Sequence, residues 1–288
     1  IIVVYTSNFM KKNLITSYKA HGSRSLGPSV RQVIPSAVKH VDPFVFLDHF
    51  GPIEKKPGWQ GIPPHPHAGI TTITYLFKGS NRHQDSKGND EIIYAGDIAL
   101  MQAGKGIVHA EGMNENRTTS EIVEGLQFWI SLPAKDKFID PNFNYYPSKQ
   151  LPEFKLNGAT VKVLIGELLG HKSPVKSLSP FYIFEFKIPR NISIQIPIKE
   201  NDSTGLYVIN GHIKIEDQNI LSNIMTSFSL IGDSIEINAI EDTHFILFGG
   251  TPLNEPIVGY ASYVMNSEEQ IQQVILDYQS GKMGNVKI

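Results

Sequence analysis

The sequence predicts an all-β protein with two similar β domains in tandem and one short helix near the C-terminus. Most of the chain consists of short apolar or alternating segments interrupted by Gly, Pro, Asn and Asp, a pattern typical of antiparallel sheets. Helical periodicity is clear only near the C-terminus. A weak internal repeat relates the two halves and indicates that the second domain resembles the first.

The composition excludes several classes of protein. The chain has 288 residues, with 26 Lys+Arg against 28 Asp+Glu and a formal charge of −2, so a general electrostatic binder of DNA is not expected. It has no cysteine, which leaves His, Asp and Glu to hold any metal. No segment approaches the roughly 18 consecutive apolar residues of a membrane span, and the apolar residues 1–4 lack the features of a signal peptide. We therefore expect a soluble cytoplasmic protein, or a nuclear one if the source is eukaryotic.

The expected strands are bounded by turn residues along the whole chain. The pair Asn210-Gly211 stands between two of them and predicts a type I′ hairpin. The strands are Thr71–Lys78, Glu91–Tyr94, Ile98–Met101, Leu126–Leu132, Thr160–Ile165, Tyr182–Ile188, Ile192–Ile196, Leu206–Ile209, Ile213–Glu216, Ser234–Asn238 and His244–Phe248.

One helix is expected after Ser267. Ser267 and Gln270 form the pattern of a capping box, and Gly281 is placed to end the helix. The apolar residues recur at helical spacing on one face, which predicts packing of this helix against a barrel. They are Ile271, Val274, Ile275 and Tyr278.

The repeat predicts two domains, 1–134 and 135–288, with a polar linker at about 133–152. Its matches are Tyr75 with Tyr207, Gly79 with Gly211, Gly96-Asp97 with Gly232-Asp233, and His109 with His244, at offsets of 132 to 136.

Two triplets of residues contain the candidate metal ligands. His65-Pro66-His67 and His109-Ala110-Glu111 each place two metal-binding side chains two residues apart, on one face of an extended chain. Two such strands facing each other form a cup of three imidazoles and one carboxylate, which suits a divalent first-row metal and leaves coordination positions open for chemistry.

Other readings of single residues stay open. One His-x-His in a Pro-rich segment is more often an exposed loop, and His109 alone could be a hydrogen-bonded interior histidine; their joint occurrence favours metal. His83 fits either a role behind the ligands or a surface hairpin, and Trp129 either a pocket wall or plain core. His49 has no spaced partner and is not assigned to metal.

The second domain is expected to lack the metal ligands. Carried forward by the repeat offset, the first triplet falls on Pro197 and Lys199, and Glu111 falls on Ile246. His212 and His244 are then structural or surface residues, and one metal per chain is predicted.

At these residues the sequence resembles the pirin family of bicupins. The similarity covers nearly the whole chain, and its most specific parts are the His-Pro-His and the Ala-Gly-x-Gly-Ile-x-His-x-Glu patterns. The motifs are residues 41–52, 65–69, 74–76, 83–88 and 103–111 in the first half, and 166–167, 170, 173–175, 249–256 and 263–266 in the second.

The resemblance implies two cupin (jelly-roll) β-barrels in tandem with a short C-terminal helix. It maps the family's metal ligands onto His65, His67, His109 and Glu111, and implies Fe(II) first, with Mn, Co, Ni, Cu or Zn as alternatives. The chain departs from many pirins at Leu100, Gln102, Lys105 and Thr71, which bears on the polarity of the pocket.

Two functions follow from the resemblance. Pirin-like proteins resemble quercetin 2,3-dioxygenases, which implies an enzyme that cleaves a flavonol with O2 and uses Glu111 as a catalytic base as well as a ligand. The alternative is a non-enzymatic, metal-bound redox sensor or transcriptional co-regulator that acts through a protein partner. A monomer without direct nucleic-acid or membrane binding is expected in either case.

Overall fold

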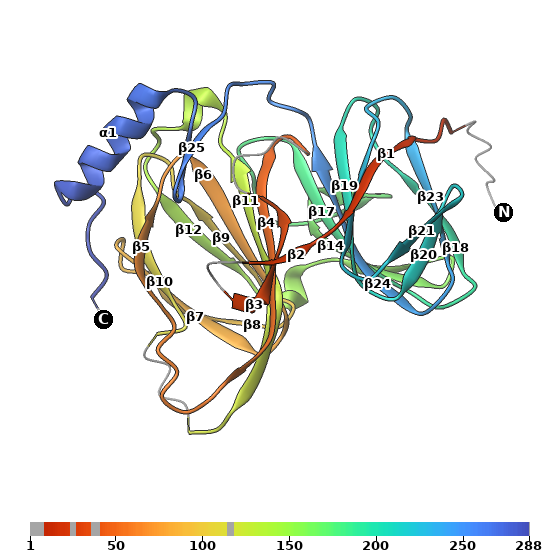
Figure 1. Ribbon diagram of the computed structural model, residues 1–288, viewed down its shortest axis with the longest axis horizontal. Helices are drawn as coiled ribbons and strands as arrows, with labels where there is room; N and C mark the ends of the chain where they lie inside the picture. Colours follow the sequence, from red (N-terminus) through yellow and green to blue (C-terminus); the bar gives the residue numbers. More distant parts are fainter. Residues whose placement is uncertain (1–8, 24–26, 36–40, 114–117, 288) are drawn as a thin grey trace. The chain divides into compact units, whose positions relative to one another are not determined.

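The computed structural model describes residues 9–23, 27–35, 41–113 and 118–287. Within these ranges the chain is almost entirely β, with one α-helix and the short 3-10 helices η1 (Ala134–Asp136) and η2 (Ser148–Gln150), which confirms the predicted fold class (Figure 1). Contacts divide the chain into two compact units. Unit I contains Ala20–Leu151, Val175–Ser179 and the chain from Leu253 onward, and unit II contains the chain up to Lys19, Pro152–Pro174 and Pro180–Pro252.

Unit I has two main antiparallel sheets that share a core. Leu76, Ala99 and Val123 of the large sheet pack with Ile93 of the small sheet, so the two sheets face each other as in a jelly-roll barrel. The large sheet has the order β12 (Asn142–Tyr146), β9 (Ile98–Gln102), β6 (Ile70–Lys78), β11 (Glu121–Ser131), β4 (Phe44–Lys55), β3 (Gly27–Ile34) and β2 (His21–Ser23). The small sheet has the order β5 (Ile62–His67), β10 (Ile107–Glu111), β7 (Ser80–Asp85) and β8 (Asp90–Tyr94).

Unit II repeats this arrangement, and its core likewise joins both of its main sheets. Its large sheet has the order β1 (Leu14–Lys19), β22 (Ile224–Phe228), β19 (Ser203–Asn210), β24 (Thr243–Gly250), β17 (Phe181–Ile188), β14 (Ala159–Ile165) and β13 (Glu153–Leu156). Its small sheet has the order β18 (Ser193–Pro197), β23 (Ser234–Ala239), β20 (His212–Ile215) and β21 (Gln218–Leu221), and a short pair joins β15 (Glu167–Leu168) to β16 (His171–Lys172).

The two units match strand for strand, because each order in unit I has a counterpart in unit II. Gly79 and Gly211, which the repeat aligns, both have positive φ and both follow a central strand of the large sheet. A Cβ on either would lie about 2.5 Å from a carbonyl oxygen, that of Ile122 or of Asp242. Glycine is therefore required where the chain turns from the large sheet into the small one.

The predicted type I′ hairpin at Asn210-Gly211 is wrong. A turn lies there, but β19 belongs to the large sheet of unit II and β20 to the small one, so the two strands do not pair. The repeat is also wrong in aligning His109 with His244: β10 lies between β5 and β7, whereas β24 lies between β19 and β17 and corresponds to β11. The counterpart of β10 is β23.

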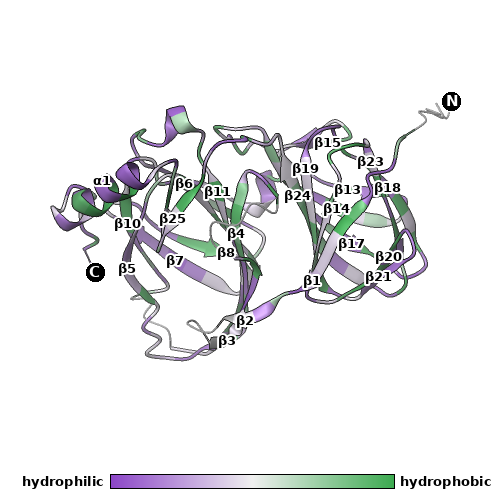
Figure 2. Ribbon diagram, turned by 45° about the horizontal axis from the view of Figure 1, so that its top comes forward, coloured by the Kyte–Doolittle hydropathy of each residue, from purple (hydrophilic) through white to green (hydrophobic). Residues whose placement is uncertain are grey.

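The predicted C-terminal helix is present as α1 (Glu268–Gln279), and the Ser267 hydroxyl accepts a hydrogen bond from the Gln270 backbone N–H. Gly281 follows at a φ of +77°. Figure 2 shows that α1 carries both hydrophobic and hydrophilic residues. Ile271 and Val274 are buried against the strands β25 (Val258–Tyr260) and β26 (Tyr263–Met265), whereas Tyr278 is exposed. No described helix is long and apolar enough to cross a membrane.

The compact units are discontinuous in sequence, unlike the predicted domains 1–134 and 135–288. The division into these two continuous domains stays a prediction. Strand β1 pairs with β22 in unit II, whereas α1 and the predicted linker at 133–152 lie in unit I apart from its last residue. The linker also contains β12, which pairs with β9 at the edge of the large sheet of unit I.

We predict that Gly69→Ala destabilises the protein by at least about 2 kcal/mol, because Gly69 has a φ of +73° and an added Cβ would collide with the carbonyl oxygen of Val264. Gly58→Ala is the matched control, since Gly58 also has positive φ but no atom within 4 Å of an added Cβ. Urea unfolding of the two variants separates the backbone cost from the collision. Equal destabilisation of both would contradict the close approach at Gly69.

Candidate metal centre

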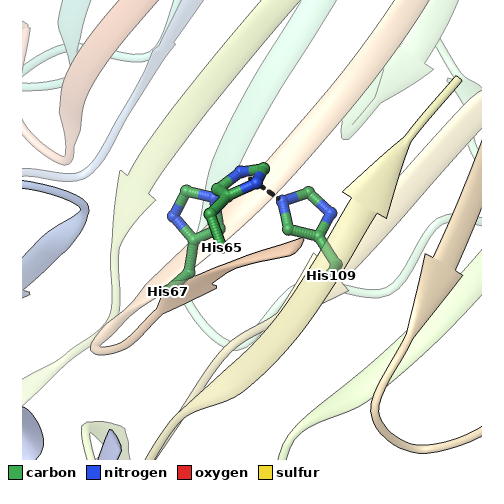
Figure 3. Close-up of side chains that lie close together, drawn as sticks. All are labelled: His65, His67 and His109. Carbon is green, nitrogen blue, oxygen red and sulfur yellow. Dashed lines mark hydrogen bonds between the residues drawn. The ribbon is translucent and has the colours of Figure 1, made fainter. Parts of the chain in front are cut away.

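Three histidines converge from two paired strands (Figure 3). β5 and β10 are antiparallel, with His65 opposite His109 and His67 opposite Ile107. Residues two apart on a strand point to the same face, so His65 and His67 lie on the same face of the paired strands as His109. Their ligand atoms lie within 4.8 Å of one another, and the Nε2 atoms of His65 and His109 are 3.0 Å apart.

The proline-rich segment is a strand because of its place in the sheet. β5 lies at the edge of the small sheet and pairs only with β10. Proline has no backbone N–H to donate and is tolerated at a sheet edge. The edge position therefore accommodates the prolines of this segment, and the exposed-loop alternative for the His-Pro-His is wrong.

Residues next to the histidines pack on the C-terminal segment. Ala68 and Val108, each adjacent to a histidine of the cluster, belong to one buried cluster with Ile271 and Val274 of α1 and with Tyr263. The packing of α1 next to the histidines could not be predicted from the sequence, because the spacing of apolar residues shows which face of a helix is buried but not what covers it.

The Nδ1 atoms of two rings face backbone carbonyls. His65 Nδ1 lies 2.9 Å from the Pro63 oxygen, and His67 Nδ1 lies 3.3 Å from the Ser262 oxygen. A carbonyl oxygen only accepts, so each Nδ1 carries the proton and donates, which leaves each Nε2 with a lone pair. The carbonyls thus select the tautomer that a metal ligand needs.

Burial keeps the inner rings neutral. Burial, and next the charge of neighbouring His65, lowers the pKa of His67 to about 3. Burial, followed by the other histidines around it, lowers the pKa of His109 well below its usual range. Neutral imidazoles with converging lone pairs are a donor set that a divalent first-row cation satisfies, so these residues fit the metal that the resemblance implies.

His83 and Asp85 lie behind His109. His83 Nδ1 is 3.5 Å from His109 Nδ1, and His83 Nε2 is 3.1 Å from a carboxylate oxygen of Asp85. Asp85 also accepts hydrogen bonds from Lys87 and Asn89, and its pKa is lowered despite the opposing effect of burial, through hydrogen bonds from His83 and Asn89. When His83 Nε2 donates a hydrogen bond to Asp85, His83 Nδ1 has a lone pair and can accept a hydrogen bond from the N–H at His109 Nδ1.

His83 is therefore not a surface residue. It is 4% exposed, and its ring stacks on Phe143 with 4.1 Å between ring centroids. Of the two alternatives left open by the sequence, the position behind the ligands is the one that the structure supports.

Glu111 is two residues beyond His109 on β10 and is half-buried. It lies opposite Ile62 on one side and His83 on the other, and the register with β5 shifts between His109 and Glu111. Glu111 is not in the group of described residues whose ligand atoms lie within 4.8 Å of one another. Its role as fourth ligand and base stays a prediction.

Aromatic residues border the cluster. Trp129 of β11 makes an edge contact with His67, with ring centroids 5.1 Å apart. Its other neighbour is Phe46 of β4, stacked at 4.2 Å. Trp129 is half-buried and also packs against a hydrophobic core cluster, so it borders both the histidines and the core.

Three further histidines have polar partners outside the cluster. His49 is buried and lies 3.3 Å from a carboxylate oxygen of Glu124, His212 lies 2.9 Å from the side-chain oxygen of Asn219, and His244 lies 2.7 Å from Glu185. Among the described residues, no group other than His65, His67 and His109 gathers three potential ligands.

The pairing of β18 with β23 shows what replaces the cluster in unit II. Ile194 lies opposite Ile237, and Ile196 opposite Ile235, which reproduces the register of β5 and β10. Ile194, Ile196 and Ile237 therefore stand where unit I has His65, His67 and His109, and all three are buried.

A protein made of two jelly-roll units, with a histidine cluster in one of them and apolar residues at the matching positions of the other, is a bicupin with a candidate metal site in one unit. The pirin family model matches residues 27–130, and the model of the pirin C-terminal cupin domain matches residues 183–284. The chain belongs to the pirin family.

Its relatives and structural neighbours agree with that assignment. The chain is 33% identical to human Pirin over 95% of its own length and 94% of that protein, and 34% identical to Pirin-like protein 2 of Arabidopsis thaliana over 88% and 79%. A crystal structure of quercetin 2,3-dioxygenase from Acinetobacter baumannii superposes with a TM-score of 0.90 and 28% identity, covering 96% of this chain and all of that one. The bacterial pirin YhhW from Escherichia coli, in complex with nickel(II), has a TM-score of 0.62 and 20% identity over 82% of this chain and all of that one, and shows the shared fold.

We predict that His83→Phe weakens metal binding about 10- to 100-fold, because it keeps an aromatic ring against Phe143 but removes the acceptor behind His109. A competition titration against a chromophoric chelator measures the dissociation constant. His83→Asn, whose side-chain oxygen can replace the accepting Nδ1, should retain more of the affinity. An unchanged constant in His83→Phe would show that His109 needs no support from His83.

We predict that the metal-free protein loses stability as the pH falls below about 6.5. His67 stays neutral in the folded state down to about pH 3, whereas in the unfolded chain it protonates near 6.5, so the unfolded state binds more protons in this window. His67 alone should account for about 2 kcal/mol between pH 7 and pH 5. Urea unfolding of the wild type and of His67→Gln at both pH values measures the contribution of His67 to the free energy of unfolding. If this free energy falls by the same amount in both proteins between pH 7 and pH 5, the prediction is wrong.

Proposed function

We propose that this protein is a metal-dependent dioxygenase that cleaves quercetin or a related flavonol with O2. The main observation behind this proposal is that the Nε2 atoms of three histidines converge, and that two of these atoms are 3.0 Å apart. The Nδ1 atoms of the same rings already have hydrogen-bond partners. Support also comes from the likeness to quercetin 2,3-dioxygenase from Acinetobacter baumannii over the full length of that chain.

One divalent transition metal per chain is proposed, Fe(II) first, with Mn, Co, Ni, Cu or Zn as alternatives. When bound, such an ion supplies Lewis acidity toward a hydroxyl oxygen and coordination positions for small ligands. In the overall reaction O2 is the sole oxidant: both of its atoms enter the ring-opened product, and one ring carbon leaves as carbon monoxide.

The protein's own residues would bind and deprotonate the flavonol. Glu111, on the ligand strand β10 and half-buried, is proposed as the fourth ligand and as the base that accepts the flavonol hydroxyl proton on a carboxylate oxygen. Trp129, stacked on Phe46 and in contact with His67, provides a flat apolar wall for an aromatic ligand and excludes water from that side.

We predict that protein reconstituted without oxygen with one equivalent of Fe(II), Mn(II), Co(II), Ni(II) or Cu(II) consumes quercetin when air is admitted, and that Glu111→Gln lowers the rate about 10²- to 10⁴-fold. Loss of the visible band of quercetin and release of carbon monoxide report the reaction. Glu91→Gln, which removes an exposed carboxylate on β8 of the same unit, is the matched control.

The metal content of each variant is measured alongside the rate. Retained metal with a lost rate would assign Glu111 the role of base, whereas lost metal would assign it the role of ligand. Wild-type protein that holds one metal and leaves quercetin intact would contradict the proposed activity and favour the redox-sensor or co-regulator function, with a protein partner in place of a flavonol.

A further inference from the structure

The side chain of Asp48 is ionisable and buried. It lies in the apolar strand β4 and is 4% exposed. Its Oδ1 atom is buried and makes no hydrogen bond to any residue that the structure describes. A buried acceptor without a hydrogen bond destabilises the folded state, so the presence of Asp48 at this position indicates a role other than folding.

The side chain of Asp48 lies on the inner face of the large sheet in unit I. Asp48 is opposite Gln127, as Phe46 is opposite Trp129 two residues away, so these four residues share one face. Trp129 on this face contacts His67 of the small sheet. On the other side of Asp48, Phe50 packs on the core cluster that joins the two sheets.

The surroundings of Asp48 are not charged. Its cross-strand neighbours are Gln32 on β3 and Gln127 on β11. The Gln127 side-chain oxygen accepts a hydrogen bond from Thr74, which shows that this face carries a short row of polar groups. Burial raises the pKa of Asp48 to about 7.

We propose that Asp48 is a specificity-determining residue that hydrogen-bonds a hydroxyl of the aromatic ligand, at a position remote from the oxygen that reaches the metal. This inference rests on the proposed function. The histidine cluster holds one end of the ligand from the small sheet, and Asp48 meets the other end from the large sheet. A site built to pair a ligand hydroxyl discriminates strongly against analogues that lack it, because the buried group then stays unpaired.

The order of residues along β4 supports this division of roles. Phe46 stacks on the aromatic wall next to the cluster, Asp48 follows one residue pair further along the same face, and Phe50 closes the apolar core beyond it. One polar position between two aromatic ones selects a planar ligand with a hydroxyl at its far end.

The test compares two ligands on zinc-loaded protein, since zinc binds the same donors but has no redox chemistry. Quercetin and the parent flavonol both carry the chelating hydroxyl and ketone, but the parent lacks quercetin's other hydroxyls. We expect Asp48→Ala to weaken quercetin binding about tenfold or more and to leave the parent flavonol within about twofold of wild type. Asp48→Asn, which keeps the Oδ1 acceptor, should recover part of the loss.

Melting temperatures distinguish this role from a structural one. Removing an unpaired buried carboxyl should not lower the melting temperature, whereas removing a structural hydrogen bond would. Asp202→Asn is the matched control, because Asp202 is a buried aspartate of unit II whose pKa burial also raises, but its carboxylate accepts a hydrogen bond from Thr251. It should change neither affinity.

Equal weakening of both ligands by Asp48→Ala, or no change in either, would overturn the role of Asp48 while leaving the proposed function intact. If Asp48→Ala does not fold, Asp48→Leu decides, because leucine is similar in shape to aspartate and has no acceptor: a loss confined to quercetin supports the assignment, and unchanged selectivity refutes it. Wild-type protein that holds one zinc and binds neither flavonol would overturn the proposed function and this inference together.

Discussion

The antiparallel register of β5 and β10 is the constraint on which the metal centre depends. It places His65 opposite His109 and leaves His67 one residue pair further along the same face. Ala68 and Val108, next to the histidines, pack against α1, and the Nδ1 atoms of the rings face Pro63, Ser262 and His83. Backbone pairing, packing and hydrogen bonds therefore fix the position, orientation and tautomer of the donors before any ion arrives.

The histidine cluster could be predicted because its information is local. Alternation along a strand is enough to place His65 and His67 on one face. The resemblance of the motifs to the pirin family then joined these two residues with His109 in one site. His83 could not be assigned, because whether a histidine in a turn-rich segment is buried depends on Phe143 and Asp85, which meet it only in the folded barrel. Asp48 did leave a signal in the sequence, as a charged residue within the apolar run Phe44–Phe50, but a run of this kind does not show which face is the interior.

The fold class was predictable and the assignment of strands to sheets was not. Turn residues show where the chain bends, but Asn210-Gly211 looks the same whether the next strand pairs with the preceding one or crosses to the facing sheet. Sparse repeat matches likewise aligned His109 with His244, whereas the strand pairing equates it with Ile237. The isoleucines at these positions show that the second unit has core residues where the first has the histidine cluster.

The pairing of β1 with β22 has a consequence for synthesis. Leu14–Lys19 forms the edge of a sheet whose other members begin at Glu153, and its partner strand ends at Phe228. A ribosome delivers this segment first and its docking surface more than 200 residues later. Translation at about 5–20 residues per second leaves the strand without its neighbour for at least about ten seconds. Its alternation of half-buried and exposed residues, with lysine at its end, suits a segment that must stay unpaired in water for that time.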